Sequence, residues 1–130
     1  MPAEAFSGTW SFDRVVSELK SPPPEWRQMI RVEGSRISVR EEITRESGCS
    51  VVEVPGAFDG EFYRVEGSPL VEEIAYTLEG ESIRGTGRKQ RAVVLHEVAN
   101  LSDPDTLNLA VTIVLGGKEL PLGNAVFRRV

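Results

Sequence analysis

The sequence predicts an all-β fold, an up-and-down antiparallel β-barrel of about ten strands. Short segments rich in β-branched and aromatic residues alternate at fairly even spacing with residues that favour turns. Apolar periodicity of helical length is absent, and the nearest candidate, residues 14–20, runs directly into prolines. Many short strands in one open sheet would curl and would expose aggregation-prone edges. We therefore expect the sheet to close on itself.

The strands are expected between successive turn signals. They cover residues 8–16, 26–33, 35–44, 50–54, 61–66, 70–78, 81–88, 91–101, 106–115 and 118–130. The one longer connection, residues 17–25, contains Pro22, Pro23 and Pro24, which exclude a helix there. Gly85 and Gly87 within one strand, and Pro121 and Gly123 within the last, predict bends or bulges.

The short connections predict the topology. When nearly every connection is short, neighbours in sequence are neighbours in space, and the first strand meets the last. A β-sandwich is the alternative architecture, but the long crossovers of a Greek key are not found.

Composition limits the classes of protein. A chain of 130 residues has room for one hydrophobic core, so we expect a single soluble domain over residues 1–130. Acidic residues outnumber basic ones by 20 to 15, which argues against a nucleic-acid partner. No segment approaches the roughly 20 apolar residues of a membrane span. Residues 1–4 do not resemble an export signal, so a cytoplasmic protein is expected unless a leader has been removed.

Gly8-Thr9-Trp10, on the first expected strand, resembles the opening motif of the calycin superfamily, which includes lipocalins and fatty-acid-binding proteins. In that family the tryptophan plugs one end of the barrel and is often covered by an arginine of the last strand. The resemblance therefore implies a structural role at the barrel end for Trp10 with Arg128 or Arg129. The strand number is similar to fatty-acid-binding proteins, whereas the proline connection is more similar to bacterial lipocalin-like proteins.

The sequence also departs from that family. Residues 17–25 are too short and too rich in proline for the helical lid of fatty-acid-binding proteins, so no lid is expected. Their Arg-x-Tyr carboxylate clamp is replaced here by Ala125-Val126-Phe127. The glycine-rich continuation of haem-binding barrels is absent as well, and we expect no cofactor.

Motifs for catalysis or metal binding are not found. His96 is the only histidine and Cys49 the only cysteine, so neither a multi-histidine zinc site nor a local nucleophile pair is available. Adjacent carboxylates such as Glu41-Glu42 point to opposite faces of a strand, and we interpret them as solvated.

Mixed polar and apolar faces on several expected strands suggest a ligand-holding interior. Phe62 shares a face with Arg64, Ile74 with Tyr76, and His96 with two valines. The candidate ligand-binding residues are Tyr76, His96, Arg64, Phe62 and Ile74. The alternative is that Arg64 and its neighbours point outward.

The leading hypothesis is therefore the binding of a small hydrophobic or amphipathic molecule inside the barrel. The runner-up is a structural or protein-interaction module with a core filled by its own side chains, and a cofactor-free enzyme using the pocket is a third possibility. A cavity of about 300 Å³ or more would favour the first.

Overall fold

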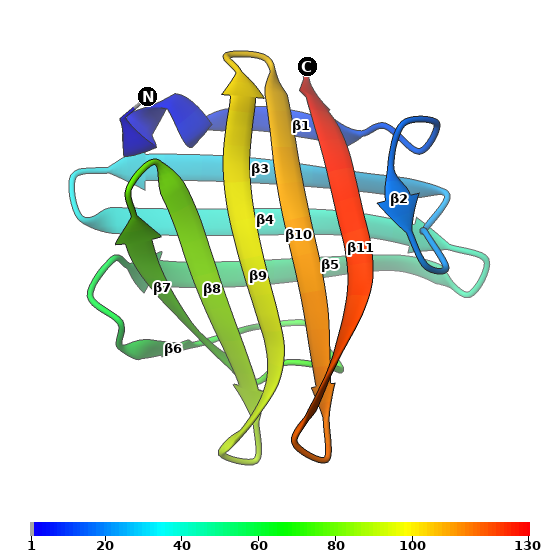
Figure 1. Cartoon of the computed structure of the whole chain (residues 1–130), viewed down its shortest axis with the longest axis vertical. Helices are drawn as coiled ribbons and strands as arrows, with labels where there is room; N and C mark the ends of the chain where they lie inside the picture. Colours follow the sequence, from blue (N-terminus) through cyan, green and yellow to red (C-terminus); the bar gives the residue numbers. More distant parts are fainter. Residues whose placement is uncertain (1) are drawn as a thin grey trace.

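Strands account for most of the computed structural model, which describes residues 2–130 (Figure 1). A short 3-10 helix, η1 (Ala3–Phe6), precedes the first strand. The strands are β1 (Gly8–Phe12), β2 (Glu18–Leu19), β3 (Glu25–Glu33), β4 (Arg36–Arg45), β5 (Gly48–Ala57), β6 (Phe62–Arg64), β7 (Glu73–Glu79), β8 (Ser82–Lys89), β9 (Ala92–Asp103), β10 (Thr106–Leu115) and β11 (Lys118–Arg129).

All strand pairs are antiparallel, in the order β5-β4-β3-β1-β11-β10-β9-β8-β7-β6. β1, β3, β4 and β5 form one layer, and β7 to β11 cross in front of it (Figure 1). The two layers are joined where the first strand meets the last, with Trp10 opposite Arg129. The predicted all-β, up-and-down barrel is thus confirmed, including the absence of a helical lid within the described residues.

The barrel is nearly closed at a seam between β5 and β6, the two ends of the strand order. A single β-bridge joins Glu53 to Glu66 across this seam. Each of the two residues donates its backbone N–H to the carbonyl oxygen of the other at 2.9 Å. Backbone pairing therefore surrounds the interior, with its weakest point at this bridge.

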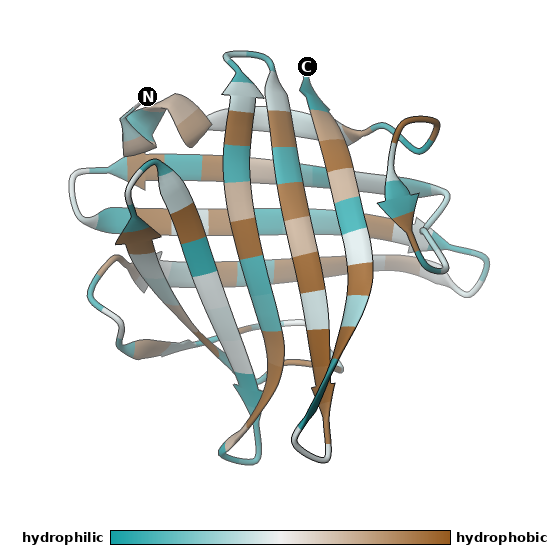
Figure 2. Ribbon diagram, in the orientation of Figure 1, coloured by the Kyte–Doolittle hydropathy of each residue, from teal (hydrophilic) through white to brown (hydrophobic). Residues whose placement is uncertain are grey.

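Alternating side chains place an apolar set inside the barrel, as the hydropathy of each strand shows (Figure 2). The predicted bends are also present. Strand register shifts between Gly87 and Arg88, and β11 carries an irregularity beside Gly123 and Pro121. At Gly123, which has a φ of +122°, a Cβ would lie 1.9 Å from the carbonyl oxygen of Glu18, so only glycine fits.

The main differences from the predicted elements lie early in the chain. β1 ends at Phe12, because residues 13–16 form a turn in which the Asp13 carboxylate accepts a hydrogen bond from the Val15 N–H. The proline connection contributes a short strand, β2, which pairs with β11. η1 was not predicted either, because its four residues carry no helical periodicity.

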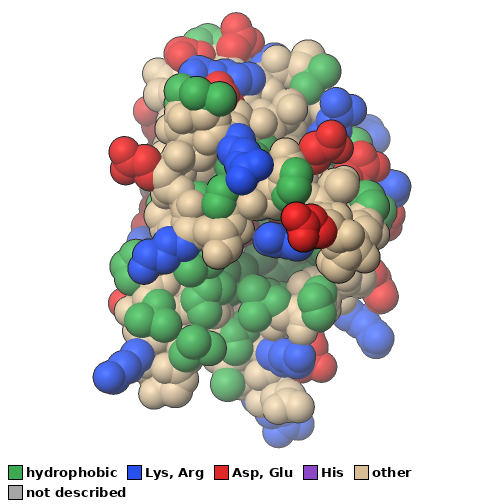
Figure 3. Space-filling view, turned by 90° about the vertical axis from the view of Figure 1, so that its right-hand side faces the viewer, with side chains coloured by type: hydrophobic (Ala, Val, Ile, Leu, Met, Phe, Trp, Pro, Cys, Tyr) green, Lys and Arg blue, Asp and Glu red, His purple; other side chains and the backbone are tan. Residues whose placement is uncertain are grey.

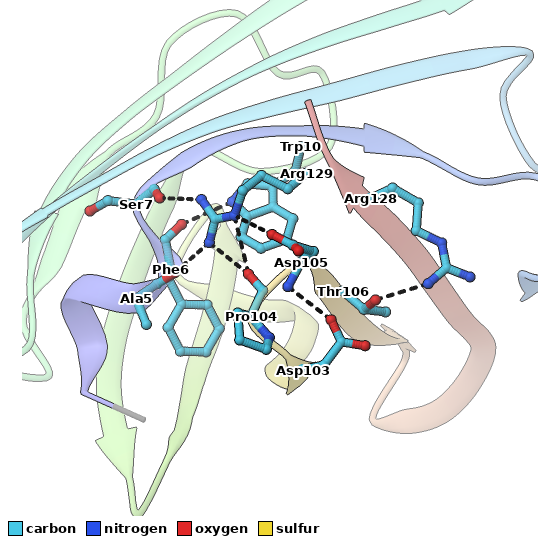
Figure 4. A network of polar contacts seen from close by, with 10 residues as sticks. All are labelled: Ala5, Phe6, Ser7, Trp10, Asp103, Pro104, Asp105, Thr106, Arg128 and Arg129. Atoms are coloured by element: carbon cyan, nitrogen blue, oxygen red, sulfur yellow. Dashed lines mark hydrogen bonds and ion pairs between the residues drawn. The ribbon is translucent and has the colours of Figure 1, made fainter.

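Trp10 closes one end of the barrel and is fully buried. Its Nε1 donates a hydrogen bond of 2.9 Å to the Phe6 carbonyl, and the Arg129 guanidinium lies over its ring (Figure 4). Arg128, the other candidate, faces away and contacts Asp13 at 3.3 Å and the Thr106 hydroxyl at 2.8 Å. Arg129 is therefore the residue that covers the indole.

Among residues 2–130, no helix has the length and apolar character needed to cross a lipid bilayer.

Candidate functional site

A cavity of about 440 Å³ lies between the two layers of the barrel. Most of its lining is apolar and comes from strands of both layers. Representative lining residues are Ile30, Val39, Val54, Ile74, Ile83 and Leu109. The interior is therefore not completely filled by the protein's own side chains.

The cavity reaches the surface beside the β4–β5 turn and the segment before β7. Arg45, Ser47 and Ser50 lie on the first side of this mouth, and Ser68 and Leu70 on the second. Figure 3 shows hydrophobic side chains gathered around a hollow on this face of the molecule. A ligand could reach the interior here without unfolding the barrel.

Glu41 brings a carboxyl group into the cavity from β4. Its Oε1 accepts hydrogen bonds from Gln28 Nε2 at 2.5 Å and from Trp26 Nε1 at 3.2 Å. Burial raises the pKa of this carboxyl, although the two hydrogen bonds act in the opposite direction. Both donors bind Oε1. No hydrogen bond to Oε2 is found among the described residues.

Glu97 brings a second carboxyl group from β9, on the opposite wall. Burial, and to a smaller extent the negative charge of Glu41, raise its pKa to about 8. Gly85 on β8 makes room for it, because a Cβ there would lie 2.9 Å from both Cγ and Oε1 of Glu97. In the empty cavity Glu97 is therefore mainly protonated at neutral pH, and neither of its oxygens has a hydrogen-bond partner among residues 2–130.

Tyr76 completes the polar set from β7 and is only 4% exposed. Burial raises the pKa of its phenol well above 10, and the charges of Glu97 and Glu41 add to this shift. The phenol makes no hydrogen bond within the described part of the chain. Three unsatisfied or partly satisfied polar side chains thus face one apolar cavity from three strands.

Of the five predicted ligand-binding residues, Tyr76 and Ile74 line this cavity. Phe62, Arg64 and His96 lie on the outer face instead. The Phe62 ring lies 3.8 Å below the Arg88 guanidinium, and the side chain of Arg64 is 83% exposed beside Glu66. His96 Nε2 is 3.8 Å from Glu119. We correct the candidate site accordingly and leave these three residues out of it.

Sequence reasoning missed Glu41, Glu97 and Gln28. Glu41 was interpreted as solvated, and the structure corrects this: Glu42 lies nearer the surface beside Arg40, whereas Glu41 lines the cavity. Adjacent carboxylates do point apart, but Glu41 and Glu97, which lie on strands far apart in the sequence, line the same cavity. The sequence contained a signal for this, because Glu41 lies in the same alternating set of strand positions as Ile37, Val39 and Ile43, which also line the cavity.

No cluster of three or more His, Cys, Asp or Glu side chains among residues 2–130 is arranged to hold a metal ion.

Comparison with known proteins establishes the fold. No family model and no curated protein matches the chain. Solved structures do match it, and two of them are mutants of the fluorescent protein UnaG. One is 17% identical with a TM-score of 0.68, the other 18% identical with a TM-score of 0.66, and each alignment covers 99% of both chains. The chain has the fold of UnaG. The antiparallel β-barrel that the resemblance implied is thus confirmed at the level of architecture. At this identity, UnaG informs the fold and not the ligand.

Proposed function

We propose that the protein binds a small hydrophobic or amphipathic molecule inside the barrel. The observation that carries this proposal is the cavity of about 440 Å³ with a largely apolar wall. Ligand sites commonly have volumes of about 300–1,000 Å³ and contain a few polar groups within an apolar lining. A barrel built only as a structural or interaction module would fill this space to gain packing energy.

The polar groups support the same conclusion. Glu41, Tyr76 and Glu97 would each gain stability from a hydrogen-bond partner or from solvent, yet they are held in the cavity. Such groups orient a bound molecule, while the apolar wall provides most of the affinity. The proposed site therefore consists of these three side chains and the apolar wall around Ile74, within a single calycin domain of the bacterial lipocalin-like kind.

Native mass spectrometry of protein purified from its own host tests the proposal. We expect a retained small molecule, or uptake of an apolar fluorescent dye by the empty protein. Ala99, which lines the cavity, is suited to a blocking variant: Ala99→Phe should abolish dye uptake. Ala110→Phe on the outer face is the matched control and should leave uptake unchanged. If no molecule is retained and the dye responds equally to both variants, the proposal is wrong.

The three polar groups that line the cavity also favour a second candidate function, acid–base catalysis on an apolar substrate. Tyr76 and the protonated Glu97 can donate hydrogen bonds to a carbonyl oxygen, while the Glu41 carboxylate can remove a proton from the neighbouring carbon and return it. Deuterium uptake from D₂O into an apolar ketone tests this. Exchange should exceed the buffer rate and disappear in Tyr76→Phe and Glu41→Gln, and exchange at the buffer rate would exclude this candidate.

A further inference from the structure

Building on the proposed binding function, we propose that the cavity selects an apolar molecule carrying a cationic nitrogen, which is held between Glu41, Tyr76 and Glu97. The proposal names the chemical class of the ligand and excludes a fatty acid as the preferred one.

Hydrogen-bond acceptors around the cavity favour a cationic ligand. Oε2 of Glu41, both carboxyl oxygens of Glu97 and the phenol oxygen of Tyr76 make no hydrogen bond to the described residues, although all three side chains line the cavity. These oxygens border the cavity, where a bound molecule can supply the hydrogen bonds that the described residues do not. An ammonium group has three N–H donors and no acceptor, so it matches a set of convergent oxygens. A carboxylate can accept hydrogen bonds from the Tyr76 hydroxyl and from protonated Glu97, but it has no donor for Oε2 of Glu41.

The charge of the cavity lining favours a cation as well. Among the described lining residues, the only Lys or Arg is Arg45, which is exposed at the mouth. No Lys, Arg or His of the described chain neutralises Glu41 or Glu97 inside the cavity. A carboxylate placed there would meet two acidic groups in a desolvated space, whereas a cation would supply the missing counter-charge.

The space that Glu97 occupies is provided by a glycine on the neighbouring strand. Gly85 faces Glu97, and any Cβ at this position would displace the carboxyl group, since it would lie 2.9 Å from Oε1. The fold thus accommodates a buried acid where a small apolar residue would pack more favourably. A carboxyl kept for structure alone would be expected to have a buried hydrogen-bond donor, as Glu41 has in Gln28.

These observations also predict that binding releases a proton. In the empty cavity burial holds the pKa of Glu97 at about 8, so the group is mainly protonated at neutral pH. A bound cation favours the ionised form and lowers that pKa. The titratable groups that face Glu97 are Glu41 and Tyr76, with Arg45 further out at the mouth. Of these, Glu41 can contribute to proton release, because burial also raises its pKa, whereas burial moves the pKa of Tyr76 further above neutral pH.

The test compares three probes that share one decyl chain: decylamine, decanol and decanoate. Isothermal titration at about pH 7 should show decylamine binding about tenfold or more tightly than decanol, with decanoate weakest. Titration in two buffers of different ionisation enthalpy should show release of about one proton on binding decylamine and none on binding decanol.

Isosteric variants assign the preference to the cavity. Glu97→Gln and Glu41→Gln should each reduce decylamine affinity about tenfold and so reduce the preference for decylamine over decanol. Glu42→Gln, next to Glu41 but beside Arg40, is the matched control for surface charge and should change neither. Circular dichroism and thermal melting confirm that each variant is folded. Since Glu97 is mainly protonated in the empty protein, glutamine is a close substitute for it.

The outcomes separate the two proposals. If decanol binds and Ala99→Phe blocks it, but decylamine has no advantage, the cationic preference is wrong and the binding function stands. A preference for decylamine that falls in Glu42→Gln and persists in the cavity variants reflects surface charge and also overturns the inference. If none of the three probes binds in the cavity, both proposals fail.

Discussion

The guanidinium carbon of Arg129 lies 4.3 Å from the ring centroid of Trp10. The same guanidinium donates hydrogen bonds to the carbonyl oxygens of Ser7 at 2.8 Å and Ala5 at 2.9 Å. It also binds the carbonyl of Pro104 in the β9–β10 turn. One side chain of the last strand thus joins the first strand, the 3-10 helix and a turn across the closed end of the barrel (Figure 4).

Replacing Trp10 should strongly destabilise the protein. Trp10 is fully buried, so Trp10→Ala leaves a large cavity and should reduce the free energy of unfolding by about 3–5 kcal/mol. Urea denaturation followed by circular dichroism measures this. A loss below about 1 kcal/mol, typical of an exposed site, would contradict the structural role of this residue.

The two C-terminal arginines should differ in their effect on stability. Arg129→Met removes a cation–π contact and several hydrogen bonds at half-buried carbonyls, and should cost about 2–3 kcal/mol. Arg128→Met, the matched control, loses contacts to Asp13 and Thr106 from a side chain that is 51% exposed, and should cost about 1 kcal/mol or less. Thermal melting of both variants distinguishes them, and equal losses would contradict the assignment.

Stability of the empty protein should fall as pH rises between about 4.5 and 8. Burial raises the pKa of Glu97 to about 8 in the folded protein, compared with 4.5 for an ordinary glutamate. In this window the folded state holds a proton that the unfolded chain has lost, so raising the pH favours unfolding. Glu41, whose pKa burial also raises, acts in the same direction. Urea denaturation at about pH 5, 7 and 9 should show a loss on the order of a few kcal/mol.

Glu97→Gln should reduce this loss and make the variant more stable than the parent protein at about pH 9. Hydrogen bonds lower the pKa of Asp59, Glu73 and Asp103, so these groups affect stability only in the acidic range, where it falls as they become protonated. Burial raises the pKa of Tyr76 above the window. A pH dependence identical in Glu97→Gln and the parent would show that Glu97 is not buried as described.

The seam between β5 and β6 should be sensitive to substitution at Gly67. This residue has a φ of +88°, and a Cβ there would lie 2.1 Å from the carbonyl oxygen of Val51. Gly67→Ala should therefore cost about 2 kcal/mol or more and accelerate hydrogen exchange at the amides of Glu53 and Glu66. The control, Gly34→Ala, has a similar φ of +57° but no neighbouring atom within 4 Å. It should cost about 1 kcal/mol and leave those amides unchanged.

The architecture could be predicted from sequence because turn residues and side-chain parity are local signals. Glycine and proline divide the chain into strands, and short connections make consecutive strands pair, which places Trp10 beside Arg129. β2 could not be predicted in this way, because a strand of two residues in a proline-rich loop has no pattern of its own. It is formed by pairing with Gly123 and Asn124, far away in the sequence.

The candidate site was predicted less well for a different physical reason. Charged residues are rarely buried without partners, so the rule that assigns glutamates to the surface is usually correct. It fails at Glu41 and Glu97, where the inward parity of the neighbouring apolar residues was the better guide. On β9 the prediction chose the face of His96, and the structure turns the alternate face inward. Glu41 and Glu97, which break the rule that charged residues lie at the surface, are also two of the residues of the proposed ligand site.

The incomplete closure of the barrel also affects whether two protein molecules can associate through their strand edges. An edge strand with free backbone donors is a template to which a second chain can add. Here the β5 edge contains Pro55, which has no N–H to offer, and the opposite side carries the exposed, oppositely charged pair Arg64 and Glu66. These features disfavour intermolecular strand addition, so the protein can keep an incompletely paired wall without becoming prone to fibril formation.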